Sequence, residues 1–307
     1  MAIGRLRLKK SGYDFPPYRP PSEARSLLLR VTRGCTWNKC TFCSMYRHIP
    51  FEKRPIDDIR SDIAAAAHHC REETETVFIA DSNSLVVNTN TVIEILELLR
   101  SSFPNLHRIT CYARAKTLSK KPLADLEHLR RAGLSRLHVG LETGHAGLLR
   151  DIRKGATPED FLKAGEKARQ AGLELSLYVL LGIGGQDLWR EHAFATASVL
   201  SRIDPQFIRV RTLQPQPGSR IYENMKAGSF RKASHETVLL EQRLLIENLR
   251  VTSHYLSDHI TNYVPVNGKL PEARQAMLAT INDCLACYEH DPSLQRRFHR
   301  KDGIERL

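Results

Sequence analysis

The chain has 307 residues, enough for one large domain with an appendage or for two modest domains. Hydrophobic residues make up 41% and charged residues 26%, as in an ordinary globular protein. No apolar run reaches the roughly 20 residues needed to cross a bilayer, and no apolar stretch follows the basic N-terminus. We therefore expect a cytoplasmic protein without a membrane partner. The net charge of +12 indicates either solvated basic helix faces or an RNA or phosphorylated partner.

Residues 1–25 are rich in proline, tyrosine and arginine, and they predict an extended N-terminal arm because each X-Pro step disfavours a helix. After the arm, short apolar runs rich in β-formers alternate with longer stretches of helical periodicity. The predicted strands cover residues 26–32, 76–80, 108–112, 136–141, 173–181 and 206–213. Predicted helices cover residues 90–100, 123–132, 158–171 and 188–203. This alternation indicates βα units around a parallel sheet.

Six strands are fewer than the eight of a closed barrel, so residues 26–225 predict an α/β core built as a partial (β/α)6 open barrel of parallel strands. A doubly wound sheet is the alternative. Strand signals stop after residue 222, and helices are predicted over 233–258 and 271–287. Residues 226–307 are therefore expected to form a C-terminal helical extension. In either architecture the chemistry belongs at the carboxyl ends of the strands.

Three of the seven cysteines, Cys35, Cys40 and Cys43, follow the first predicted strand within nine residues. A loop can wrap three thiolates around one centre, and Gly34 eases the turn. The possible explanations are incidental buried cysteines, a structural zinc site completed by His48, or a [4Fe–4S] cluster held by three thiolates with one iron left open. Structural zinc sites usually pair ligands from two separated knuckles, so the pattern favours the cluster.

The cysteine loop, which ends in Cys-x-aromatic-Cys with Phe42 and precedes a βα array, resembles that of the radical S-adenosylmethionine superfamily, with an Elp3/MiaB/NifB-like core. The resemblance covers about residues 26–225. One departure concerns spacing: four residues separate Cys35 from Cys40, whereas three are commonest, which leaves the subfamily open. The resemblance implies a [4Fe–4S] cluster, S-adenosyl-L-methionine as cofactor, and a one-electron donor such as ferredoxin or flavodoxin as partner.

Two further segments resemble cofactor-binding elements of this superfamily. The turn after the second strand contains Asp81, Ser82 and Asn83, whose side chains or carbonyls would accept hydrogen bonds from the amino group of S-adenosylmethionine. The alternative for Asp81 is an Asx-type turn that caps the next helix. At the end of the fourth strand, Glu142 would accept hydrogen bonds from the ribose or the amino group, and Gly144 would let the backbone approach.

The resemblance also assigns cofactor contacts farther along the chain. One of the basic residues Arg153 and Lys154 would pair with the methionyl carboxylate, and Arg153 is the one assigned, although a solvated helix end explains them equally well. Gly182 and Gly184 resemble the segment that contacts adenine. Phe42, within the cysteine loop, and Leu213, at the end of the sixth strand, complete the expected contacts.

Arginines near the strand ends are candidate substrate ligands. Arg209 and Arg211 alternate with apolar neighbours, so they point to one face of the sixth strand. If that face is the barrel interior they would bind an anionic substrate, as would Arg114, and otherwise they are ordinary exterior residues. Cys284 and Cys287 share a helix face, but two thiolates alone cannot complete a second cluster.

The resemblance implies an enzyme that cleaves S-adenosylmethionine reductively and forms a 5′-deoxyadenosyl radical, which abstracts hydrogen from a substrate. A small molecule is expected as that substrate, and no catalytic residue is assigned beyond the cluster. One alternative is a radical enzyme that modifies tRNA or another RNA, a function that the positive charge favours. A second alternative is a non-catalytic zinc or iron–sulfur protein.

Overall fold

The computed structural model describes residues 13, 15 and 18–302, and its centre is one eight-stranded sheet with the order β1-β4-β5-β6-β7-β8-β9-β10. Six of these strands are the predicted ones: β1 (Leu27–Arg30), β4 (Thr76–Ala80), β5 (Arg108–Tyr112), β6 (Leu134–Glu142), β7 (Glu174–Leu181) and β8 (Phe207–Thr212). Each pairs in parallel with the one before it. The prediction of a parallel α/β core is therefore confirmed.

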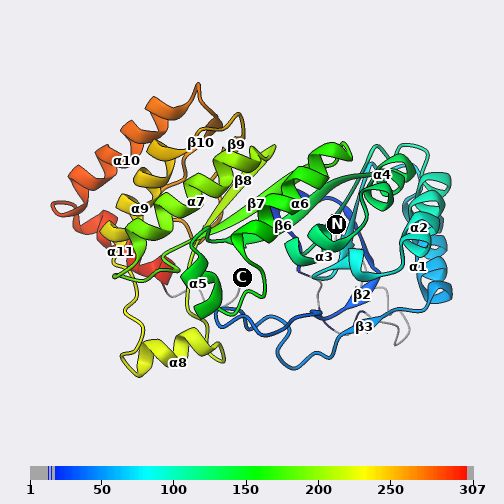
Figure 1. Cartoon of the computed structure of the whole chain (residues 1–307), viewed down its shortest axis with the longest axis horizontal. Helices are drawn as coiled ribbons and strands as arrows, with labels where there is room; N and C mark the ends of the chain where they lie inside the picture. Colours follow the sequence, from blue (N-terminus) through cyan, green and yellow to red (C-terminus); the bar gives the residue numbers. More distant parts are fainter. Residues whose placement is uncertain (1–12, 14, 16–17, 303–307) are drawn as a thin grey trace.

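The strands follow one another across the sheet in chain order, without the reversal that defines a doubly wound sheet. β1 and β10 (Asn267–Lys269) are the two edges, so the sheet is an open, partial barrel. Figure 1 shows this progression, with the early elements on one side of the molecule and the late elements on the other. The partial barrel is confirmed, and the doubly wound alternative is wrong.

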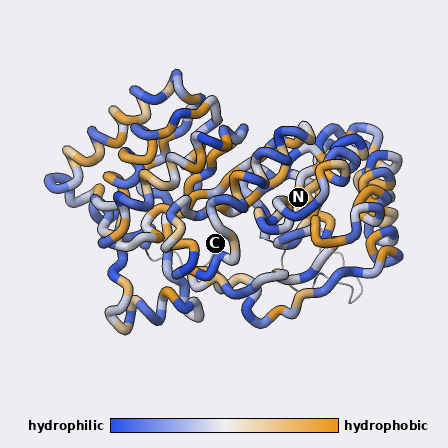
Figure 2. The backbone as a smooth tube through the Cα atoms, in the orientation of Figure 1, coloured by the Kyte–Doolittle hydropathy of each residue, from blue (hydrophilic) through white to orange (hydrophobic). Residues whose placement is uncertain are grey.

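Helices connect the strands and cover the outer side of the sheet (Figure 1). The longer ones are α1 (Ile56–Cys70), α2 (Thr89–Ser102), α4 (Leu123–Ala132), α6 (Pro158–Gln170) and α7 (Trp189–Ile203). Short helical segments follow strand ends: η2 (Ser84–Val86), α3 (Ala115–Lys120), α5 (Ala146–Asp151) and α8 (Arg220–Lys226). Hydrophobic and hydrophilic residues alternate along these helices in Figure 2, because one side of each packs on the sheet.

The C-terminal extension is mainly helical, with α9 (His235–Asn248), α10 (Arg274–Tyr288) and α11 (Pro292–Asp302). The predicted helix over 233–258 is wrong in its second half, because α9 ends at Asn248 and β9 (His254–Leu256) follows. β9 pairs in parallel with β8, and β10 pairs antiparallel with β9. Strand signals therefore do not stop after residue 222, since two strands of three residues each extend the sheet.

The expected N-terminal arm falls partly outside the described residues, which begin with Tyr13, Phe15 and residues 18–25. Its last part is a 3-10 turn, η1 (Pro21–Glu23), instead of an extended chain. Glu23 is fully buried and contacts Ser26 at 2.6 Å, His138 at 3.2 Å and Arg108 at 3.4 Å. The arm thus places a carboxylate inside the barrel, near the amino ends of the strands.

No helix among the described residues is both long enough and apolar enough to cross a membrane.

We expect the C-terminal strands to be part of the cooperative core. Leu270, next to β10, is 0% exposed, whereas Ile260 in the preceding loop is 62% exposed. Leu270→Ala should lower the free energy of unfolding by about 2–5 kcal/mol, because it leaves a cavity in a packed core. Ile260→Ala, the matched control, should change it by less than about 0.5 kcal/mol. Denaturant unfolding measures both, and equal effects of the two substitutions would contradict the packing described.

Candidate active site

The three clustered cysteines lie in the loop between β2 (Thr32–Arg33) and β3 (Glu52–Lys53), just beyond the carboxyl end of β1. Gly34 has φ of +79°, and a Cβ built on it would lie 2.8 Å from the carbonyl oxygen of Pro50. Glycine is therefore the residue that fits this turn without strain. Gly34 N–H donates to Asp81 Oδ2 at 3.1 Å, and its carbonyl accepts from Ser82 Oγ at 3.0 Å. The turn after β4 thus holds the start of the cysteine loop.

Segments that follow β6 and β8 hold the rest of the cysteine loop. Thr41 N–H donates to the Ile152 carbonyl at 2.9 Å, and Ile221 N–H donates to the Thr41 carbonyl at 3.0 Å. Trp37 Nε1 donates to the Arg153 carbonyl at 2.6 Å. Because these bonds come from separate strand ends, they fix the loop over the carboxyl side of the sheet.

The thiols of the loop are partly exposed, and none of the three forms a disulfide. Burial raises the pKa of Cys40, and it raises the pKa of Cys43 to about 11. The metal-free thiols of Cys40 and Cys43 are therefore neutral near pH 7, and metal binding there would release protons. The Lys154 ammonium acts against the rise of the pKa at both cysteines, which places a cation beside the thiols.

The donor set fits an iron–sulfur cluster. Three thiols on one loop leave one position of a four-iron cluster without a protein ligand, whereas structural zinc needs a fourth side chain. His48, the fourth ligand that a zinc site would use, is exposed. Within residues 13, 15 and 18–302, no three His, Cys, Asp or Glu side chains are already gathered as a metal site.

The turn after β4 uses its side chains to hold protein groups. Asp81 is fully buried, with Arg30 Nε at 3.3 Å. Burial raises the pKa of Asp81, and the Arg30 guanidinium and the Gly34 N–H offset this rise only in part. Asn83 Nδ2 donates to Thr117 Oγ1 at 2.9 Å. Asp81 Oδ2, Ser82 and Asn83 are thus engaged within the protein. Asp81 Oδ1 has no hydrogen-bond partner among the described residues, so it stays a candidate acceptor for an ammonium group together with the carbonyls of the turn.

Arg114, an expected substrate ligand, also positions the loop. Its guanidinium lies 5.0 Å from the ring centre of Trp37 and donates to the Lys154 carbonyl at 3.2 Å. Burial lowers the pKa of Arg114, and Cys35 and Cys40 partly offset this effect. The side chain therefore joins the cysteine loop to the segment after β6.

Glu142 ends β6 with φ of +64°, an uncommon value for a residue other than glycine. Its Oε1 accepts from Lys154 Nζ at 2.7 Å, and the ammonium also lies 5.7 Å from the centre of the Phe42 ring. Burial alone would lower the pKa of Lys154, but the Glu142 carboxylate and the Cys40 thiol outweigh burial and raise it. A charged pair thus lies beside the cysteine loop.

Lys154, and not its neighbour Arg153, contacts Glu142. The Arg153 side chain is exposed, and its carbonyl holds Trp37. Gly184 is buried, and a Cβ on it would lie 2.8 Å from the Leu188 carbonyl, so close packing accounts for this glycine. Phe42 and Leu213 pack in one apolar cluster whose other members are Ile152, Leu180, Ile183, Ile221 and Phe230. Contact of these residues with a cofactor stays a prediction.

A buried network behind the strand ends was not predicted from the sequence. Gly182, with φ of +78°, donates its N–H to Glu241 Oε2 at 2.8 Å, and the other oxygen of that carboxylate contacts His192 Nδ1. His192 Nε2 lies 3.2 Å from the Glu142 carbonyl. Glu241 on α9 therefore links the ends of β6 and β7 through α7. No local pattern marks these residues, because about 50 positions separate the partners.

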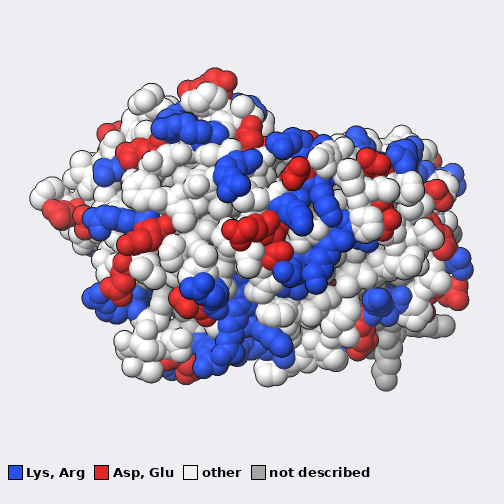
Figure 3. Space-filling model, viewed as in Figure 1, with Lys and Arg blue, Asp and Glu red and all other residues white. Residues whose placement is uncertain are grey.

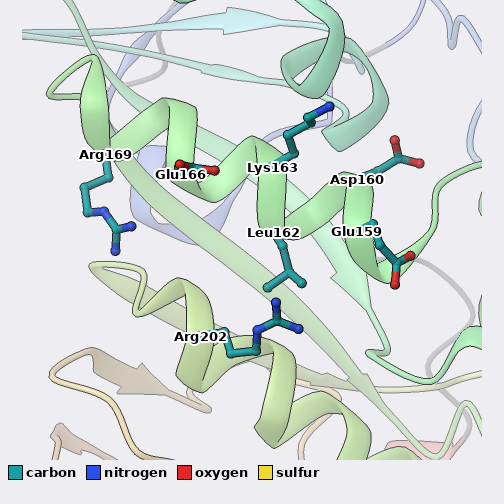
Figure 4. Close-up of a pocket in the computed structure, with 7 residues that line it drawn as sticks. All are labelled: Glu159, Asp160, Leu162, Lys163, Glu166, Arg169 and Arg202. Atoms are coloured by element: carbon teal, nitrogen blue, oxygen red, sulfur yellow. The ribbon is translucent and has the colours of Figure 1, made fainter.

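A depression on the molecular surface lies apart from these residues. Its lining comes from α6 and from Arg202 of α7, as Figure 4 shows. The lining residues are Glu159, Asp160, Leu162, Lys163, Glu166, Arg169 and Arg202. None of them belongs to the predicted site, and charges of both signs alternate along the helix, as on a solvated helix face. The candidate active site is therefore the region around the cysteine loop.

Comparison with known proteins extends the geometric description. The family model of the Radical SAM superfamily matches residues 29–196, a segment that contains the three clustered cysteines and Glu142. Methylornithine synthase (PylB) has a similar structure, with a TM-score of 0.52 and 18% identity over 83% of this chain and 68% of that one. The methyltransferase TsrM of Kitasatospora setae also has a similar structure, with a TM-score of 0.54 and 18% identity over 68% of this chain and 41% of that one. At such identities the likeness concerns the fold alone.

Curated relatives are similar at low identity. An uncharacterized methyltransferase of Pyrococcus horikoshii is 25% identical over 201 residues, which cover 64% of this chain and 41% of that protein. The heme chaperone HemW of Bacillus subtilis is 23% identical, covering 62% and 51%. A probable threonylcarbamoyladenosine tRNA methylthiotransferase of Methanothermobacter thermautotrophicus is 24% identical, covering 70% and 51%. The chain thus spans about half the length of these relatives.

We expect the Glu241 network to be essential for the fold around the site. Glu241→Ala should lower the free energy of unfolding by about 3–5 kcal/mol, because it leaves His192 and the Gly182 N–H buried without their partner. Glu247→Ala is the matched control, since this side chain on the same helix is 41% exposed, and it should cost less than about 0.5 kcal/mol. Denaturant titration compares the two, and a small effect of Glu241→Ala would show that the network is dispensable.

Proposed function

The chain belongs to the Radical SAM superfamily, and we propose that Cys35, Cys40 and Cys43 hold a [4Fe–4S] cluster whose open iron binds S-adenosyl-L-methionine. The observation that carries this proposal is the cysteine loop, held over the carboxyl ends of the strands by separate segments. A cluster held by these three cysteines would supply the electron for cleavage of S-adenosylmethionine into methionine and a 5′-deoxyadenosyl radical, and that radical would abstract hydrogen from the substrate.

The residues of this chain position the cofactor and exclude water. Glu142 offers a carboxylate oxygen to the ribose or the amino group, and the contact with Lys154 Nζ holds that carboxylate in place. Gly182 is buried and has no side chain, so the adenine of the cofactor could approach its backbone closely. The apolar cluster that contains Phe42 and Leu213 lies beside the loop. Its side chains would exclude water from the site, which limits side reactions of a radical.

A small one-electron donor such as ferredoxin or flavodoxin would deliver the electron, since the cysteine loop is partly exposed. A small molecule is the proposed substrate. RNA is the second candidate, favoured by the net charge of +12 and by the Lys and Arg side chains that gather down the middle of the face in Figure 3. Acidic side chains interrupt this band in the same view, so it is no continuous track for a phosphate backbone.

Anaerobic reconstitution with iron and sulfide tests the proposal. The wild-type chain should bind about four iron and four sulfide ions and should form 5′-deoxyadenosine from S-adenosylmethionine and dithionite. Cys40→Ala should lose both properties, because two thiolates cannot hold the cluster. Cys287→Ala, which removes an exposed cysteine on α10, should keep both. One zinc ion per chain and no cleavage would show a zinc protein instead.

Glu142 provides a separate test of the cofactor contacts. Glu142→Gln should weaken the binding of S-adenosylmethionine to the reconstituted protein about tenfold or more, because it removes a charged acceptor. Glu159→Gln, an exposed neighbour on α6, should leave the dissociation constant unchanged. Equilibrium dialysis under anaerobic conditions measures both constants. Equal affinities of the two variants would remove Glu142 from the site.

A further inference from the structure

The strand register decides the direction of Arg209 and Arg211, which the sequence left open. Arg209 pairs with Tyr178, and Arg211 pairs with Leu180, so these side chains lie on one face of the sheet. On that face Tyr178 Oη contacts His138 Nδ1 at 3.2 Å, and His138 Nε2 contacts Glu23 at 3.2 Å. Since these groups are buried on the side opposite the helices, the two arginines face the barrel interior.

The cations inside the barrel differ in whether a carboxylate of the protein pairs with them, as Asp81 pairs with Arg30. Near the amino ends of the strands, Arg136 contacts Glu174 at 2.8 Å and Arg108 contacts Glu23 at 3.4 Å. Closer to the carboxyl ends, Arg209 and Arg211 make no ion pair with any carboxylate of the described residues. The paired cations are neutralised by the protein, and Arg209 and Arg211 are left for another anion.

Arg209 is the more deeply buried of the two unpaired arginines. It is only 9% exposed, and its buried Nε has no hydrogen-bond partner among the described residues. A buried guanidinium without an anion costs several kcal/mol, so such groups are normally paired. The arrangement is that of a binding site for an anionic group.

The surroundings of the two arginines are aromatic. The Arg211 guanidinium lies 5.3 Å from the ring centre of Tyr178, and Tyr112 packs edge-on against Phe78 with ring centres 5.0 Å apart. Burial raises the pKa of Tyr178 to about 12, so its hydroxyl stays neutral and can donate a hydrogen bond. The interior therefore combines two cations with tyrosine side chains and apolar ring surfaces.

We propose that Arg209 and Arg211 bind the carboxylate or phosphate group of a small organic substrate inside the barrel. Guanidinium groups suit this role because they donate two parallel hydrogen bonds to either oxyanion. The inference rests on the proposed function and adds the chemical class of the substrate to it. The burial of Arg209 suits a small anionic molecule better than a continuous polynucleotide backbone, and so favours the small molecule over RNA.

The test uses the reconstituted holoenzyme and a small-molecule extract of the source cells, separated by anion exchange into retained and unretained fractions. The readout is the rate of 5′-deoxyadenosine formation with and without each fraction. The retained fraction should accelerate it, and Arg209→Gln and Arg211→Gln should each reduce that acceleration about tenfold or more. Arg202→Gln, an exposed arginine on α7, should keep it. Phosphatase treatment should abolish the effect of a phosphate ester and leave that of a carboxylate.

The outcomes separate the inference from the function on which it rests. Absence of cleavage in every sample, including the unsupplemented one, refutes the radical chemistry and the inference with it. Basal cleavage that responds only to the unretained fraction, to added RNA or to no addition overturns the inference alone. Acceleration that survives in both Arg→Gln variants also overturns it. Arg209→Lys and Arg211→Lys should restore part of the acceleration, and circular dichroism identifies any variant that has lost its fold.

Discussion

The hydrogen bond from the Gly34 N–H to the Asp81 carboxylate joins the two segments on which the site depends. Asp81 is buried beside Arg30, so its charge is held where the first two neighbouring strands of the sheet end. Breaking this contact would leave an ionised group without its partners in a place that water does not reach. The pairing of β1 with β4 therefore determines where the cysteine loop begins.

The C-terminal extension also holds the strand ends that surround the site. Glu241 on α9 reaches the Gly182 N–H and His192, and His192 reaches the Glu142 carbonyl. An element more than 50 residues beyond the end of β7 thus fixes the backbone at the ends of β6 and β7. This explains how a residue with a positive φ, Glu142, is kept in place at the mouth of the barrel.

The sequence predicted those parts of the fold that local patterns encode. Strands of four to nine residues between amphipathic helices have a clear periodicity, and all six were identified. β9 and β10, with three residues each, are too short for any periodic signal, and they form because β8 offers an unpaired edge. The cysteine loop was evident from spacing and residue type. Its superfamily resemblance agrees with the family model that matches residues 29–196.

The site was predicted less completely than the fold, because contacts between residues far apart in the sequence decide which side chains are available. Sequence identifies which residues can bind a ligand, but burial and distant partners decide which remain available. Asp81 was expected to accept a hydrogen bond from a cofactor, and one of its two carboxylate oxygens, Oδ2, already contacts Gly34 and Arg30. Arg209 has no such commitment, and its availability appears only once the register places it inside the barrel.

The central claim is that three protein thiolates leave one iron free for S-adenosylmethionine. Mössbauer spectroscopy of protein reconstituted with the iron-57 isotope tests it most directly, because each iron site contributes its own signal. The account predicts that S-adenosylmethionine changes the signal of about one iron in four and leaves the others as they were. Four iron sites that remain alike and unchanged on addition of S-adenosylmethionine would contradict it.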